Sequence, residues 1–217
     1  MKRLLTTIVV GLAGVQGITW ANESRPRLMV GIMVDQIRTD YLESLRDMFG
    51  PGGFKRLMEN GVYLKDIEGG VVPGDAASAT ALIMTGEYPR YTGVTGSRVY
   101  DGASKSLKPV FYDESYLGNF TDETYSPGAL RVTTLSDEIS LESEGKSQVH
   151  SIAPDAASAI VMAGHTGNSA FWLNDDTGRW SSSTYYQNPP AVLQLSNYNT
   201  PIISRLDTLK WVPLRNG

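Results

Sequence analysis

The sequence predicts a three-layer α/β/α protein, in which helices cover both faces of a parallel sheet. Apolar runs of strand length are continuous rather than alternating, which is typical of strands buried on both faces. Segments with helical spacing alternate with these runs along the chain. The 217 residues are 41% hydrophobic and 19% charged, which is too apolar for a disordered chain and suffices for one large domain or two small ones.

The first 21 residues are predicted to be a cleaved secretory signal peptide. Lys2 and Arg3 form a positive start, residues 4–20 are mostly apolar and uncharged, and Ala21 is a small residue before the polar Asn22. A membrane anchor is the alternative, but the apolar run is interrupted by glycines and is short beside the roughly 20 residues that a span needs. We expect a periplasmic or secreted protein with no stable membrane span after cleavage.

The first predicted element after the signal peptide is a strand over residues 28–34, and Asp35 follows it directly. Asp40 is placed to cap the next helix, because residues 42–48 have helical spacing and Gly50 ends the pattern.

Further along the chain, apolar periodicity and turn residues predict the remaining elements. Helices are expected over residues 54–58 and 76–84, from Thr134 onward, and over 191–195; strands are expected over 62–67, 149–153, 159–163, 170–173 and 183–186; residues 87–130 form an irregular cap or insertion. No internal repeat or flexible linker is evident.

Composition excludes several classes of function. Lys and Arg number 19 and Asp and Glu 23, for a net charge of −4, and no basic block exists to neutralise phosphates, so nucleic acid is not an expected partner. The absence of cysteine excludes disulfides, thiolate metal sites and cysteine nucleophiles, and two histidines cannot build a His-rich zinc site.

Two positions can carry chemistry. Asp35 directly follows a predicted strand, where ligands of α/β sheets collect and where a carboxylate can hold a metal ion; alternatively it caps a loop or pairs with Arg38. Residues 73–81, with Asp75 at their turn, lead into a small-residue helix whose first N–H groups can receive a phosphate or support an anionic nucleophile. Here the alternative is that Asp75 is a simple N-cap.

Several segments, in order, carry a family resemblance: RPRLMVGIMVDQIRTDYL, FGPGGFKRLMENGVYL, MTGEYPRYTGVTGSRVYD, YSPGALRVTTLSDEI, IVMAGHTGNSAFWLNDDTG and SSTYY. The chain resembles the alkaline-phosphatase superfamily, and within it the periplasmic phosphomonoesterase and type I phosphodiesterase/nucleotide pyrophosphatase branches. The resemblance covers essentially all of residues 22–217. It implies the alkaline-phosphatase type of α/β/α sandwich and a metal-dependent hydrolase acting on a small phosphate ester.

The resemblance also implies site residues. Asp35 stands where the family has a metal-binding Asp. The family's Thr or Ser nucleophile falls on Asp75 or Ala76, according to the branch used for alignment, and neither is a hydroxyl residue. Asp75 is therefore the candidate at the nucleophile position, and Ser78 and Thr80 are weaker candidates about one helical turn further on.

Other departures concern charge stabilisation. A phosphate-contacting Asn of the phosphomonoesterase branch becomes Ser97, and the branch's Lys and Arg fall near Asp155 and Ala157. Phosphoryl transfer depends mainly on positioning and charge stabilisation, so these losses are expected to reduce the rate by several orders of magnitude.

The family's divalent metals, zinc first among them and two in number, take further Asp and His ligands from the second half of the domain. His150 and His165 do not match those positions, and His165 is expected to tie a turn through a ring N–H. We interpret the chain as the N-terminal portion of a longer domain or as a truncated reading frame.

Two functions follow. The first is a secreted metal-dependent hydrolase of phosphate esters, although this chain alone is expected to be inactive. The second is a non-catalytic relative that keeps the fold as an envelope binding or assembly protein.

Overall fold

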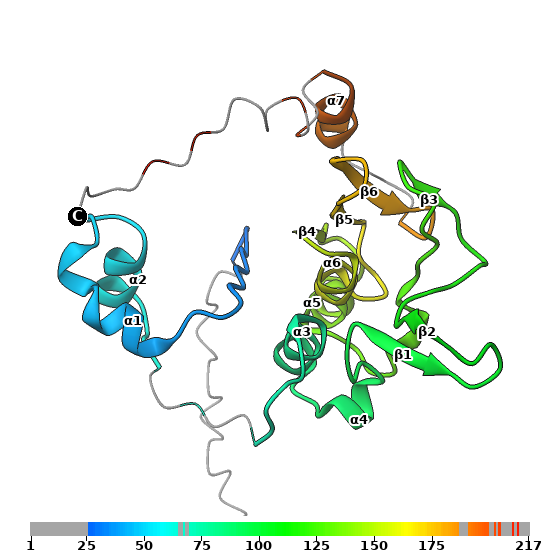
Figure 1. Cartoon of the computed structure of the whole chain (residues 1–217). Helices are drawn as coiled ribbons and strands as arrows, with labels where there is room; N and C mark the ends of the chain where they lie inside the picture. Colours follow the sequence, from blue (N-terminus) through cyan, green and yellow to red (C-terminus); the bar gives the residue numbers. More distant parts are fainter. Residues whose placement is uncertain are drawn as a thin grey trace, which may run out of the picture. The chain divides into compact units, whose positions relative to one another are not determined.

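The computed structural model describes residues 26–64, 67, 70–186 and 191–199 and the single residues 202, 204, 210 and 212 (Figure 1). The predicted signal peptide lies outside these residues. The chain divides into two units, residues 1–34 and 35–217, which are described separately. Within the described part, no helix has both the length and the apolar character needed to cross a membrane.

Residues 28–34 do not form the predicted strand. No ladder pairs with them among the described residues, and Leu28 and Ile32 are 79% and 80% exposed. The predicted strand over residues 62–67 is likewise not found at its described positions 62–64 and 67. A continuous apolar run indicates a need for burial, but it does not supply the neighbouring strand that a ladder requires.

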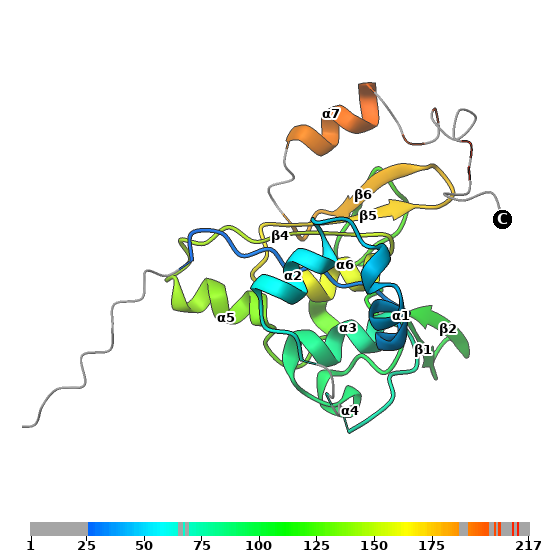
Figure 2. The same cartoon turned by 90° about the vertical axis from the view of Figure 1, so that its left-hand side faces the viewer.

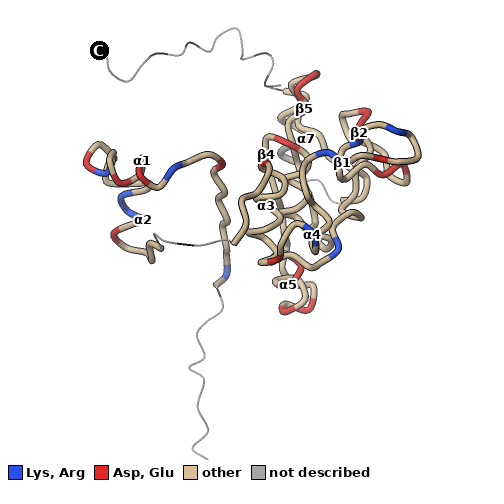
Figure 3. Tube along the Cα trace, turned by 60° about the horizontal axis from the view of Figure 1, so that its bottom comes forward, with Lys and Arg blue, Asp and Glu red and all other residues tan. Residues whose placement is uncertain are grey.

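Three short helices follow: α1 (Thr39–Ser44), the 3-10 helix η1 (Arg46–Met48) and α2 (Phe54–Asn60). They confirm the predicted helices, but the predicted cap is wrong. Arg38 is the N-cap residue of α1, and its Nε and Nη2 donate to Asp40 at 3.0 and 2.6 Å. Charges of both signs lie along these helices (Figure 3), and this exposed pair contributes little stability.

The main sheet has the order β3-β6-β5-β4. Its strands are β3 (Gly118–Asn119), β4 (His150–Ala153), β5 (Ser169–Asn174) and β6 (Arg179–Ser183). Only β4 and β5 are parallel, and the other neighbours are antiparallel, so this sheet is mixed where a parallel one was predicted. A separate antiparallel hairpin pairs β1 (Arg98–Asp101) with β2 (Ser106–Pro109).

Helices lie on both faces of this sheet, which confirms the predicted layers. In both views α6 (Ala156–Ala163) and α7 (Ala191–Asn199) are on opposite sides of β5 and β6 (Figures 1 and 2). Ala170 and Trp172 of β5 belong to the core cluster beside α6, whereas Phe171 lines a cavity below α7. This division follows the alternation of side chains along a strand.

The remaining helices complete the unit. They are α3 (Ala76–Thr85), α4 (Pro89–Thr92), the 3-10 helix η2 (Pro127–Ala129) and α5 (Leu135–Glu142). The predicted end of α3 at Gly86 and the predicted start of α5 at Thr134 are confirmed, while β6 ends at Ser183, where a strand to 186 was predicted. The core includes Ala77, Ala81, Val94, Phe111, Ile160, Val161, Trp172 and Tyr186.

The predicted strand over residues 159–163 is wrong, because these residues belong to α6. Asp155 is its N-cap and accepts a hydrogen bond from Ser158 N–H at 2.9 Å. The helix contacts both the sheet and α3, and such a helix is apolar all round, which removes the periodicity that distinguishes it from a buried strand. The same five residues, Asp-Ala-Ala-Ser-Ala, open α3 at 75–79 and α6 at 155–159, a repeat that the sequence analysis missed.

Candidate active site

Asp75 closes a capping box at the start of α3. Its Oδ1 accepts hydrogen bonds from Ser78 N–H and Ser78 Oγ, each at 3.0 Å. Ser78 Oγ in turn accepts from the backbone N–H groups of Gly74 and Asp75, each at 3.1 Å. The carboxylate therefore satisfies one of the N–H groups that every helix leaves unpaired at this end.

Ser97 joins this helix terminus from 22 residues further along the chain. Its backbone N–H donates to Asp75 Oδ2 at 2.6 Å. Burial raises the pKa of Asp75, but the hydrogen bonds from Ser78 and Ser97 outweigh it and hold the pKa below its usual value. The side chain is therefore a carboxylate at neutral pH.

The two carboxylate oxygens of Asp75 differ in access. Oδ1 faces Ser78, which is fully buried, whereas Oδ2 faces Ser97, which is exposed.

The weaker candidates are enclosed. Ser78 and Thr80 are 0% and 2% exposed. The Thr80 hydroxyl donates to the Ala76 carbonyl at 2.7 Å, as is common for a hydroxyl one turn into a helix. Of the three candidate residues, Asp75 is the least buried.

The other predicted positions lie at separate points. Asp35 is exposed and accepts from Gln36 N–H at 2.9 Å. Asp155 is exposed at the start of α6, and Ala157 follows in its first turn. Among the described residues, no group of three or more Asp, Glu or His side chains could hold a metal ion. These residues therefore do not by themselves complete a metal centre.

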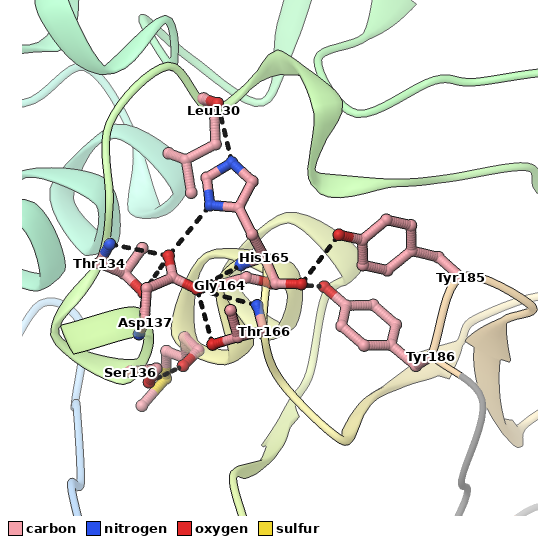
Figure 4. A network of polar contacts seen from close by, with 10 residues as sticks. Leu130, Thr134, Ser136, Asp137, Gly164, His165, Thr166, Tyr185 and Tyr186 are labelled. Carbon is pink, nitrogen blue, oxygen red and sulfur yellow. Dashed lines mark hydrogen bonds and ion pairs between the residues drawn. The ribbon is translucent and has the colours of Figure 1, made fainter. Parts of the chain in front are cut away.

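His165 ties a turn, as predicted, and its partner Asp137 was missed (Figure 4). Asp137 Oδ2 faces His165 Nδ1 at 3.0 Å and also accepts from Thr134 N–H at 2.9 Å. Oδ1 accepts from the backbone N–H groups of His165 and Thr166, both at 2.8 Å. His165 Nε2 faces the Leu130 carbonyl at 3.0 Å. Both ring nitrogens thus lie within hydrogen-bonding distance of an oxygen.

Asp137 is 4% exposed and belongs to the capping box of α5, in which Thr134 is the N-cap residue. Burial raises its pKa, and the hydrogen bonds from His165, Thr134 and Thr166 lower it further than burial raises it. The spacing of Thr134 and Asp137 fits a capping box, and that signal could have identified the carboxylate as structural.

Glu123, in the loop after β3, accepts hydrogen bonds from two aromatic side chains. Its Oε2 accepts from the indole N–H of Trp172 at 3.1 Å, and its Oε1 accepts from the Tyr125 hydroxyl at 3.0 Å. Trp172 is 1% exposed, so the carboxylate satisfies a buried donor in the core.

Glu123→Ala is expected to destabilise the fold by about 1–3 kcal/mol, because it leaves the Trp172 N–H buried without a partner. Urea unfolding followed by tryptophan fluorescence measures this change. Asp122→Ala is the matched control, since Asp122 is exposed and its removal is expected to change stability by less than about 0.5 kcal/mol. Equal midpoints for the two variants would contradict this role for Glu123.

Residues 29–215 match the family model for type I phosphodiesterase/nucleotide pyrophosphatase. The chain is 33% identical over 212 residues to alkaline phosphatase PafA of Elizabethkingia meningoseptica, an alignment covering 92% of this chain and 38% of that protein. It is 35% identical over 173 residues to alkaline phosphatase PhoV of Synechococcus elongatus, covering 75% and 30%. A calcium-transporting ATPase of Myroides odoratus is 34% identical over 165 residues, with the same coverage.

The structure is also similar to the crystal structure of wild-type alkaline phosphatase PafA. The TM-score is 0.76 at 30% identity, over 84% of this chain and 36% of the other. A quadruple variant of PafA gives the same TM-score at 31% identity. The chain therefore has the α/β fold of an alkaline phosphatase, and it spans between 30% and 38% of the length of these three relatives.

Proposed function

Because the chain belongs to the type I phosphodiesterase/nucleotide pyrophosphatase family, we propose that its function is that of a secreted, metal-dependent hydrolase of small phosphate esters. The three relatives named above include two alkaline phosphatases, which supports phosphate-ester chemistry. Export is supported by the signal-like residues 1–21.

The junction of Asp75 and Ser97 is the observation that carries this proposal. An ionised carboxylate lies there at a helix N-terminus, beside the exposed Ser97. The family resemblance puts the nucleophile position at Asp75 or Ala76. A carboxylate there has two uses: it can ligate a metal, or it can attack phosphorus as an aspartate nucleophile. Ser97 holds Oδ2 in place for either use.

A divalent metal pair, with zinc as the first choice, belongs to this proposal, with Asp35 as one ligand. Metals would supply charge neutralisation and leaving-group stabilisation. Asp35 and Asp75 are oxygen donors of a suitable kind, but the described residues do not complete a centre.

A non-catalytic binding or assembly role is the second candidate. It is favoured by Asp155 and Ala157, which stand where the phosphomonoesterase branch has Lys and Arg, and by the burial of Ser78 and Thr80. In this role the fold would be kept while the covalent step and the oxyanion stabilisation are lost.

The 217-residue chain is expected to hydrolyse p-nitrophenyl phosphate no faster than the zinc-containing buffer. The loss of an oxyanion donor alone reduces a rate by about 100- to 1000-fold. Release of p-nitrophenol would be measured for wild type, Asp35→Ala and Asp75→Asn.

Zinc-dependent turnover that Asp35→Ala abolishes would refute this expectation and make Asp75, Ser78 or Thr80 the nucleophile to pursue. For the proposed function itself, the experiment is metal analysis with the same assay on the full-length gene product. Bound metal together with turnover would support the hydrolase. The absence of both bound metal and turnover would support the binding role.

A further inference from the structure

A cavity of about 190 Å³ lies between the sheet and α7. Four aromatic side chains, Phe120, Phe171, Trp180 and Tyr198, form much of its lining, together with the amide side chains of Asn119 and Gln194. Phe171 is buried at its floor, whereas Tyr198 and Gln194 are exposed at its rim. Among the residues that the structure describes, no Lys, Arg, Asp or Glu lines it.

This cavity is distinct from the Asp75 site. Phe171 points to the face of β5 opposite to that of Ala170 and Trp172, which belong to the core cluster with Ala77 and Ala81 of α3. Asp75 begins α3, so the sheet separates the cavity from it.

The aromatic walls are held in place. Asn197, which is 6% exposed, accepts from Trp180 N–H at 2.8 Å and donates to the Trp180 carbonyl at 2.6 Å. Phe120 has a φ of +63°, a strained conformation for a bulky residue, which its surroundings must therefore impose. The Ser181 hydroxyl donates to the Phe120 carbonyl at 3.2 Å, and the Phe120 and Tyr198 rings meet edge to face at 5.9 Å.

The polar groups at the rim are available to a ligand. Within the described part of the chain, the side chains of Asn119 and Gln194 and the Tyr198 hydroxyl make no hydrogen bond, whereas most other polar side chains near the sheet do. An aromatic cavity with a few unpaired polar groups is the usual composition of a small-molecule site.

We propose that this cavity binds a neutral monocyclic aromatic compound with one hydrogen-bonding substituent, such as a phenol. An apolar cavity of about 150 Å³ holds benzene, so 190 Å³ accommodates one ring and a substituent. The ring would pack against Trp180 and Phe120, and the substituent would reach the amides of Asn119 or Gln194. The absence of lining charges selects against ionised ligands.

The test is an NMR titration of the full chain with phenol, following the Trp180 indole N–H, which Trp180→Phe identifies. We expect a saturable shift with a Kd on the order of millimolar, given the ligand's size. Tyr198→Ala and Gln194→Ala should each weaken binding about fivefold, whereas Leu195→Ala, on the same helix but outside the lining, should leave it unchanged. Tyr198 is 75% exposed, so its removal leaves the fold intact.

Cyclohexanol, which matches phenol in size but lacks the π faces, should bind at least about fivefold more weakly. The proposal is overturned if phenol gives no saturable shift, if Tyr198→Ala and Leu195→Ala bind alike, or if cyclohexanol binds as tightly as phenol.

Discussion

Asp137→Ala is expected to destabilise the protein by about 3–5 kcal/mol, the cost of removing a buried carboxylate and leaving the several donors that it satisfies without a partner. One carboxylate here accepts from three backbone N–H groups, at Thr134, His165 and Thr166, and also pairs with the His165 ring. Its loss removes one half of the α5 capping box and also releases the turn after α6. Urea unfolding monitored by circular dichroism gives the free energy.

Asp155→Ala is the matched control, because Asp155 also caps a helix but is exposed and accepts one hydrogen bond in the structure. Its loss is expected to cost about 1 kcal/mol. If both variants unfold at the same urea concentration, the Asp137 network contributes no more than an ordinary cap.

The lowered pKa of Asp137 fixes the sign of its pH dependence. Because its folded pKa lies below its unfolded value, its contribution is present above the unfolded pKa and is lost as the pH falls through the folded pKa. The difference in stability between wild type and Asp137→Ala should therefore shrink below about pH 4.

Gly164→Ala is expected to destabilise the fold by more than about 3 kcal/mol, through strain and a clash together. Gly164 has φ +69° and ψ −161°, a conformation almost confined to glycine. A Cβ added there would lie 2.7 Å from Asp137 Oδ1 and still closer to Thr134 Oγ1.

Gly86→Ala separates these two causes. Gly86 has φ +70° at the end of α3, but an added Cβ meets nothing within 4 Å. Strain alone should cost about 1–2 kcal/mol. Thermal unfolding of both variants measures the contrast, and a Gly164→Ala midpoint at or above that of Gly86→Ala would show that the network gives way without cost.

The sequence predicted those parts of the fold that local chemistry determines. Gly86 and Thr134 mark helix ends through preferences that act within a few residues, and both are confirmed. The family resemblance is confirmed by the match over residues 29–215. The strand predictions for residues 28–34 and 159–163 were wrong. An apolar run indicates that a segment is to be buried, but it does not specify whether a neighbouring strand or helix packing buries it.

The candidate site was predicted less completely. Asp75 was identified from its turn and helix, but its contact with Ser97 joins residues 22 positions apart, and the one between Asp137 and His165 spans 28. No short pattern encodes such pairs. The nucleophile and metal assignments of Asp35, Asp75, Ser78 and Thr80 remain predictions.

The alanines at the contact between α3 and α6 limit which substitutions this protein can accept during evolution. Ala77, Ala81, Ala159 and Ala163 are each at most 2% exposed, in two helices that contact each other. A larger side chain on one helix would push the other away and carry its capping aspartate with it. Substitutions at these positions should therefore covary among homologues, with a gain in volume on one helix matched by a loss on the other.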